Sequence, residues 1–133
     1  MLRGVTLQLE GVASLGMVAF HTSTLRRALL NLVQNAAEAM PQGGTVTLAG
    51  QATARQVQLE VRDTGSGIPA EKLARIFEPL YTTKPGGTGL GLYIVQEIVT
   101  AHKGQIIVQS TVGHGTTFMI TLPRGLYRDC HEC

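Results

Sequence analysis

A glycine-dense loop in the second half of the chain has the composition of a phosphate-binding site. Residues 84–92 read KPGGTGLGL and lead into an apolar pattern typical of a helix. Glycines let backbone N–H groups approach an anion, and the first turn of a helix adds unpaired donors and the positive end of a dipole. Lys84 adds a mobile positive charge just before the glycines. The loop therefore predicts a phosphate site.

Three polar side chains, Asn31, Asn35 and Glu38, share one stripe of a long helical pattern, because steps of four and three bring side chains together. Their oxygen atoms suit Mg²⁺, which keeps several waters and is completed by substrate phosphates. A solvated polar face explains the same stripe, since Arg27 and Gln34 lie on that side, opposite the leucines. The stripe indicates a metal site only if other motifs accompany it.

Residues 63–69 read DTGSGIP and directly follow an alternating strand pattern. A carboxylate at a strand end can accept the exocyclic amine of adenine, which guanine does not offer at that position. Gly65 and Gly67 would let a base lie against the backbone. The plain alternative is a glycine turn in which Asp63 accepts a hydrogen bond from the backbone that follows it. A calcium loop does not fit, because the segment has only one carboxylate.

Two rival site classes share parts of these motifs. The tetrapeptide at 63–66 also resembles the catalytic motif of aspartic proteases, in which two chains could pair and share one proton. Those proteins are almost entirely β, whereas helical patterns occupy residues 23–40 and 90–103 here. Residues 87–91 give G-x-G-x-G rather than G-x-G-x-x-G, and Lys84 precedes the glycines instead of following them as in a P-loop. The sequence therefore predicts neither a protease nor a Rossmann or Walker site.

The periodicity of apolar residues predicts alternating strands and helices in one domain, the size that 133 residues suit. A cap at Thr22 or Ser23 begins the first long helix, and Gly104 is expected in the left-handed position that ends the last one. The core-facing positions expected of the first helix are Leu25, Leu29, Leu32, Ala36 and Met40. Strands are expected at 5–9, 45–48, 56–62, 105–110 and 116–122, with a further short one at 17–20, and helices at 23–40, 70–76 and 90–103.

Charge and composition exclude several functional classes. The net charge is +2, from 11 basic and 9 acidic residues without a run of like charge, so nothing calls for a nucleic-acid partner. No apolar stretch approaches the roughly 20 residues of a membrane span. Cys130 and Cys133 lie in the last four residues and support no disulfide framework. We expect a soluble, cytoplasmic domain.

Four motifs follow one another along the chain: residues 31–39, 63–69, 76–84 and 87–92. In that order they resemble the N, G1, F and G2 boxes of the ATP-binding catalytic domain of sensor histidine kinases. The resemblance covers residues 5–123, and the sequence around Asn35 and at residues 82–87 is most similar to the nitrogen-regulation branch. His21 and Leu80 depart from the acidic and aromatic residues usual in the family, at positions that do not touch the expected chemistry.

The resemblance implies a two-layer α/β sandwich of the Bergerat type, with about three helices packed on one face of a mixed, mostly antiparallel sheet. It implies that ATP and Mg²⁺ bind between the helix layer and a lid. Asn31 and Asn35 would be the catalytic residues, with Asn35 as the Mg²⁺ ligand, and Asp63 would bind the adenine amine. The other implied contacts are Glu38, Gly65, Gly67, Ile68, Thr83, Lys84, Gly87, Thr88, Gly89, Leu90, Gly91 and Leu92, with Thr116 or Thr117 supporting Asp63 through water.

The resemblance also implies a phosphate acceptor outside this chain, a histidine on the kinase's own dimerisation domain. None of the four histidines here (His21, His102, His114, His131) has the helical setting of such an acceptor. We therefore expect a fragment of a larger homodimeric kinase, with residues 1–126 as the catalytic domain, 127–133 as a tail and a response regulator downstream. The alternative is a serine kinase of the anti-sigma type, or a nucleotide-sensing module of the same fold. Whether the parent protein is membrane-bound stays open.

Overall fold

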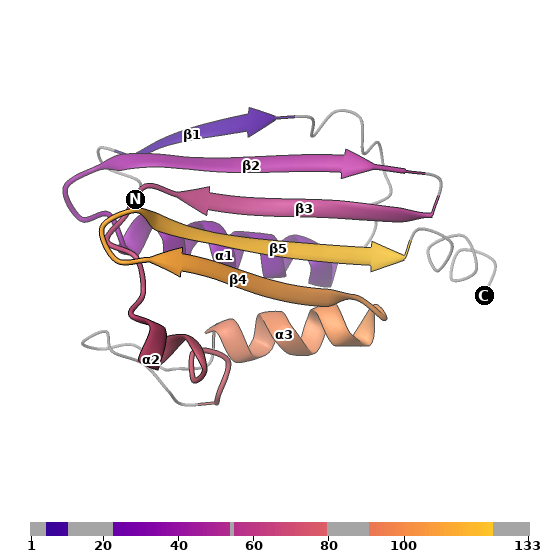
Figure 1. The fold of residues 1–133 in the computed structure, drawn as a ribbon. Coiled ribbons are helices and arrows are strands. Elements are labelled where there is room, and N and C mark those ends of the chain that lie inside the picture. Colours follow the sequence, from indigo (N-terminus) through magenta and orange to yellow (C-terminus); the bar gives the residue numbers. More distant parts are fainter. Residues whose placement is uncertain (1–4, 11–22, 54, 80–90, 124–133) are drawn as a thin grey trace.

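The computed structural model describes residues 5–10, 23–53, 55–79 and 91–123 (Figure 1). These residues form five strands and three helices. The strands are β1 (Val5–Glu10), β2 (Gly44–Ala52), β3 (Gln56–Asp63), β4 (Gln105–Thr111) and β5 (Gly115–Pro123). The helices are α1 (Ser23–Glu38), α2 (Ala70–Leu73) and α3 (Gly91–Ala101).

The strands form one mixed sheet in the order β1-β2-β3-β5-β4. The pair β1 and β2 is parallel, and α1 makes the crossover between them, as a parallel connection requires. The other three pairs are antiparallel. The predicted fold class, helices on a mixed and mostly antiparallel sheet, is therefore confirmed.

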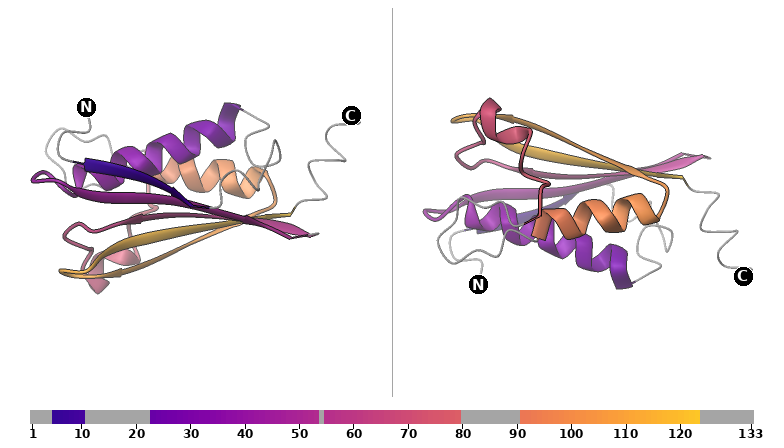
Figure 2. Two further views of the ribbon diagram at one scale, coloured as in Figure 1. Left: turned by 90° about the horizontal axis from the view of Figure 1, so that it is seen from above. Right: turned by 90° about the horizontal axis from the view of Figure 1, so that it is seen from below.

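Helices α1 and α3 lie side by side on one face of the sheet (Figure 2), and α2 contacts β4. The strands alternate toward this helix layer, so that Val57, Leu59 and Val61 of β3 are all buried beneath it. The apolar positions predicted for the first helix (Leu25, Leu29, Leu32, Ala36 and Met40) are buried as well. The core thus lies between the two layers.

The end of α3 differs from the sequence prediction. Lys103, not Gly104, takes the left-handed conformation, with φ of 61°. Its N–H donates to the carbonyl of Thr100 (2.9 Å), and the N–H of Gly104 donates to the carbonyl of Val99 (2.9 Å), which together make a Schellman motif. Gly104 is required for a different reason, because a Cβ there would lie 2.5 Å from the carbonyl oxygen of Thr121.

Other predicted boundaries need smaller corrections. Strand β2 continues to Ala52, four residues past the prediction, because it pairs with β3 along its length. Helix α2 is one turn and ends at Leu73, after which backbone turns replace the predicted helix up to residue 76. The strand expected at 17–20 lies outside the described residues.

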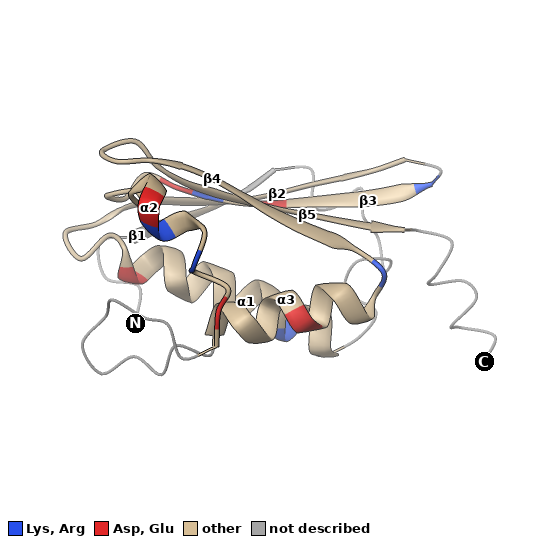
Figure 3. Ribbon diagram, turned by 60° about the horizontal axis from the view of Figure 1, so that its bottom comes forward, with Lys and Arg blue, Asp and Glu red and all other residues tan. Residues whose placement is uncertain are grey.

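Charged residues are scattered over the described helices and strands without gathering on one element (Figure 3). This distribution agrees with the absence of like-charge runs in the sequence. Among the helices that the structure describes, none has both the length and the apolar character of a membrane span.

Candidate functional site

Asp63 ends the buried row of β3. Its side chain follows Val57, Leu59 and Val61 on the face toward the helices, and the residue is only 8% exposed. The N–H of Gly65 donates to Asp63 Oδ1 at 2.8 Å, which fixes the orientation of the carboxylate. A charged acceptor is thus held at the edge of the apolar core.

The surroundings of Asp63 act on its protonation in two directions. Burial is the larger influence and raises the pKa of the carboxyl above its ordinary value of 3.8. Backbone N–H groups of Gly65 and Thr116 lower the pKa, and the net change is upward. A donor brought by a ligand would replace part of the hydration that burial removes from the charged form.

The loop after Asp63 is anchored on both sides. On one side it meets β2, where the N–H of Thr64 donates to the carbonyl of Thr45 (3.2 Å) and the N–H of Thr45 donates to Thr64 Oγ1 (3.1 Å). On the other side it meets the β4–β5 turn, where the N–H of Gly113 donates to the carbonyl of Ser66 (2.8 Å). The loop is therefore preorganised by contacts within the chain.

The two loop glycines, predicted to line a base, are required by the packing of the loop. A Cβ on Gly65 would lie 2.8 Å from the carbonyl oxygen of Ala39 and 3.1 Å from Met40 Cγ. Gly67 has φ of 78°, and a Cβ there would meet the carbonyl oxygen of Thr111. Contact with a base remains a prediction for both.

Ser110 is a site residue that the sequence reasoning missed. It lies near the end of β4, opposite Thr116 in the register. Its Oγ accepts the N–H of Ile68 (2.7 Å), donates to the carbonyl of Gly115 (2.9 Å) and lies 2.8 Å from Thr116 Oγ1. No sequence signal marks this serine, because its three partners come from a distant loop and a neighbouring strand. Ile68, a predicted contact residue, is thereby joined to the site through its backbone.

The structure distinguishes the two threonines proposed to support Asp63. Thr116 is paired with Asp63 across β3 and β5 and is buried on the same face. Thr117 is paired with Arg62, so its side chain points to the opposite face of the sheet. Only Thr116 can support Asp63.

The polar stripe of α1 ends beside the Asp63 loop. Asn31 and Asn35 are half-buried, and Glu38 is exposed. The N–H of Ala39 donates to the carbonyl of Asn35 (3.2 Å), and the carbonyl oxygen of Ala39 would lie 2.8 Å from a Cβ on Gly65. One helical turn therefore separates Asn35 from the loop that follows Asp63.

Part of the predicted phosphate site can be placed. Gly91 and Leu92 form the first turn of α3, which packs beside α1 (Figure 2). A Cβ on Gly91 would meet nothing within 4 Å, so no described packing requires a glycine there. The remaining predicted contacts (Thr83, Lys84, Gly87, Thr88, Gly89 and Leu90) lie outside the described residues.

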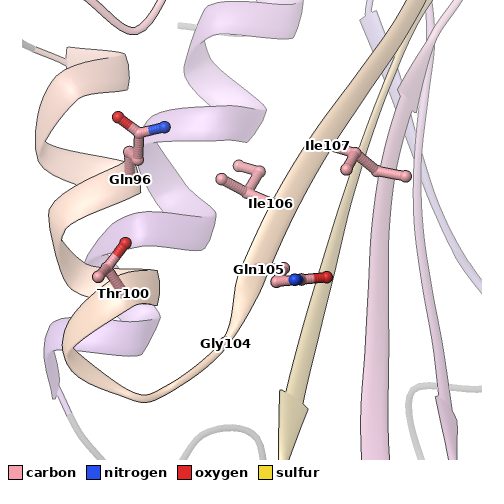
Figure 4. A pocket seen from close by; sticks show the side chains of 6 residues that line it. All are labelled: Gln96, Thr100, Gly104, Gln105, Ile106 and Ile107. Atoms are coloured by element: carbon pink, nitrogen blue, oxygen red, sulfur yellow. The ribbon is translucent and has the colours of Figure 1, made fainter.

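The donor set fits ATP with Mg²⁺. A fixed carboxylate suits an amine, and the amide side chains of two half-buried residues on one helix face suit a hard cation that shares its shell with water and phosphate. A groove of about 350 Å³ lies elsewhere, between α3 and the start of β4 (Figure 4). Its lining residues are Gln96, Thr100, Gly104, Gln105, Ile106 and Ile107. Because Ser110 and Thr111 form the other end of β4, this groove is separate from the Asp63 site.

Comparison with known proteins identifies the family. The family described as "Histidine kinase-, DNA gyrase B-, and HSP90-like ATPase" matches residues 21–126. The chain belongs to this family. The match spans α1 to β5 and includes Asn35, Asp63 and Thr116, so the site described above lies within the family's ATP-binding domain.

Similar proteins are sensor kinases. The chain is 40% identical over 107 residues to sporulation kinase C of Bacillus subtilis, covering 80% of this chain and 25% of that protein. It is 38% identical over 126 residues to the sensor histidine kinase ZraS of Escherichia coli K12, covering 95% of this chain and 27% of that protein. The chain thus spans about a quarter of the length of these relatives.

Solved structures give the same result for the fold. The mycobacterial sensor histidine kinase MprB superposes with a TM-score of 0.72 at 30% identity, covering 90% of this chain and 82% of that one. The catalytic domain of the histidine kinase ThkA superposes with a TM-score of 0.73 at 28% identity, covering 91% and 80%. The closer assignment to the nitrogen-regulation branch stays a prediction.

Proposed function

We propose that this chain is the ATP-binding catalytic domain of a sensor histidine kinase. It binds ATP with Mg²⁺ and donates the γ-phosphate to a histidine on the kinase's dimerisation domain. The observation that carries the proposal is the buried Asp63 carboxylate, oriented by Gly65 beside the polar end of α1. The solved histidine kinase structures that this fold matches support it.

Different residues bind the adenine end and the phosphate end of ATP. Asp63 accepts the adenine amine, with its direction set by Gly65 and the neighbouring Thr116. Asn35 holds Mg²⁺, and Asn31 and Glu38 orient water or phosphate from the same stripe. The metal offsets negative charge on the phosphates when bound. Residues 83–92 surround the phosphates, with backbone N–H groups at the start of α3.

The protein's contribution to transfer is mainly positioning. Phosphoryl transfer needs the acceptor and the leaving oxygen in line, with charge on the phosphate oxygens stabilised by groups fixed beforehand. The anchored loop after Asp63 and the packed α1–α3 pair supply such a fixed frame.

The described histidines support an acceptor outside this chain. His102 Nδ1 lies 2.8 Å from the carbonyl oxygen of Ile98, to which it donates at the end of α3. His114 is exposed between two turn glycines, Gly113 and Gly115. Neither histidine lies on the exposed face of a helix, which is the setting expected of a histidine that accepts phosphate.

The parent protein supplies the remaining parts under this proposal. It forms a homodimer through the dimerisation domain, passes phosphate to a response regulator, and keeps this domain in the cytoplasm. Residues 1–126 are the catalytic domain, and 127–133 are a tail.

A transfer assay tests the proposal. The chain is incubated with γ-labelled ATP and Mg²⁺, with and without the helical histidine segment of the parent protein. We expect label on that segment that is labile to acid and stable to base, and its loss in Asn35→Ala. Gln34→Ala, an exposed neighbour on α1, is the matched control and keeps the transfer. Label on serine of another protein, or binding without transfer, would favour the anti-sigma or sensing class instead.

A further inference from the structure

Strand β4 lies at one edge of the sheet. Among the described strands it pairs only with β5, so its other edge has no strand partner for its backbone N–H and C=O groups. The last residues of β4 are packed against other parts of the chain, since α2 contacts β4 and a Cβ on Gly67 would meet the carbonyl of Thr111. The first residues instead border the groove beside α3 (Figure 4).

This edge lacks the features that usually prevent an edge strand from pairing. Edge strands are commonly protected by lysine, proline, inward-pointing charges or a bulge. Strand β4 has no charged residue, no proline and no glycine, and its register with β5 runs without a bulge. The residues that line the groove are uncharged as well, and Ile107 is 51% exposed. The start of β4 is therefore suited to receive a further strand.

The residue types along this edge are symmetric about Ile107. Residues 105–109 read QIIVQ. If two copies pair antiparallel about a two-fold axis at Ile107, this side chain faces its own equivalent. Gln105 then faces Gln109 of the second copy, so that amide meets amide. Ile106 likewise faces Val108, so that apolar meets apolar. The edge is thus complementary to itself at every position.

The faces of the two sheets also agree in such a pair. Residues directly opposite each other across antiparallel strands lie on the same face. Ile106 turns toward α3, whereas Ile107 turns to the other side of β4 (Figure 4). Pairing would therefore cover the exposed Ile107 and place both helix layers on one side, with the two grooves next to each other. No like charges meet along the paired strands, because β4 and the groove lining carry none.

We propose that the free edge of β4 binds a second copy of this chain, so that two β4 strands pair antiparallel about Ile107 and the two sheets become one. Five paired residues form a much smaller contact than the roughly 1,600 Å² of a standard stable interface, so separate chains associate weakly. Two copies within one homodimeric protein pair more readily, because tethering raises their effective concentration to the order of millimolar. That second setting rests on the proposed function, whereas the edge itself lies apart from the ATP site.

Disulfide cross-linking of the whole chain tests the pairing, after Cys130 and Cys133 have been replaced by serine. Opposite Cα atoms in an antiparallel pair are about 4.5–5.5 Å apart, a separation that a disulfide can span. We expect Ile107→Cys to form a linked dimer on mild oxidation. The control is Leu30→Cys on α1, where the native side chain is 62% exposed. Ile107→Cys should link about tenfold faster or more, since pairing holds the two thiols at a high effective concentration.

A mixture of two further variants tests the register. Gln105→Cys and Gln109→Cys should link to each other when mixed, and neither should link to itself, because the same position in the two copies lies about four residues apart along the strands. Equal rates for Ile107→Cys and Leu30→Cys would overturn the inference. Self-linking of Gln105→Cys as fast as the linking in the mixture would overturn it too. Wild-type chain that binds no ATP would refute the proposed function, and the cross-links would still decide the pairing.

Discussion

Replacing Asp63 by asparagine should separate nucleotide recognition from folding stability. An amide would keep its oxygen 2.8 Å from the Gly65 nitrogen, because only the oxygen can accept that N–H. The amide nitrogen must then take the place of the second carboxylate oxygen, where it meets the adenine amine donor to donor. A hydrogen bond to a charged group is worth about 1.5–3 kcal/mol, so ATP affinity should fall about 10- to 150-fold.

The pH dependence of stability should change as well. Burial raises the folded-state pKa of Asp63 above 3.8, so its contribution to stability is fully present below the unfolded pKa and is lost as pH rises through the folded value. Asparagine carries no charge and loses nothing over this range. The melting temperature of Asp63→Asn, relative to the wild type, is therefore higher at pH 7 than at about pH 4.

Both effects can be measured on the same two proteins, by ATP titration calorimetry and by thermal melts at the two pH values. Glu71→Gln removes an exposed carboxylate on α2 and is the matched control, for which ATP affinity stays unchanged. ATP binding by Asp63→Asn as tight as that of the wild type would contradict the adenine contact of Asp63, and a relative melting temperature that rises on acidification would contradict its raised pKa.

Five further substitutions, two of them matched controls, test the packing and the end of α3. Leu32→Ala, at a fully buried position of α1, should lower the free energy of unfolding by about 2–5 kcal/mol in urea titrations, whereas Leu30→Ala, 62% exposed on the same helix, should cost under about 0.5 kcal/mol; equal losses would contradict the two-layer packing. Gly67→Ala should cost about 1–3 kcal/mol more than Gly113→Ala in the same assay, because both have positive φ but only the first would clash with a carbonyl. Lys103→Gly should raise the free energy of unfolding by about 0.5–1 kcal/mol, since glycine adopts the left-handed conformation without strain; a loss would contradict the Schellman geometry.

Local patterns predicted the parts of the fold that depend on local physics. The buried face of α1 follows from apolar residues at helical steps, and β3 follows from strict alternation. The end of α3 was predicted wrongly because both Lys103 and Gly104 lie at the right distance from the last apolar turn. Position 104 requires glycine because a Cβ there would clash with Thr121 on β5, and that contact is not local in sequence.

In the candidate site, too, local patterns predict some residues and contacts distant in sequence determine the others. Asp63 was predicted because a carboxylate after an alternating strand is a local signal. Ser110 was missed because its importance comes from the β4–β5 register and from the distant backbone of Ile68. Thr116 and Thr117 could not be separated until the register placed them on opposite faces.

The proposed ATP site requires that Asn35 couple Mg²⁺ to ATP binding. Calorimetric titration with ATP, in the presence and absence of Mg²⁺, would be carried out on the wild type, Asn35→Ala and Gln34→Ala. We expect Mg²⁺ to tighten ATP binding to the wild type and to Gln34→Ala. In Asn35→Ala that gain disappears, while binding without metal persists through Asp63. A wild-type chain that binds no ATP, or an Asn35→Ala variant that keeps the full Mg²⁺ effect, would contradict the account.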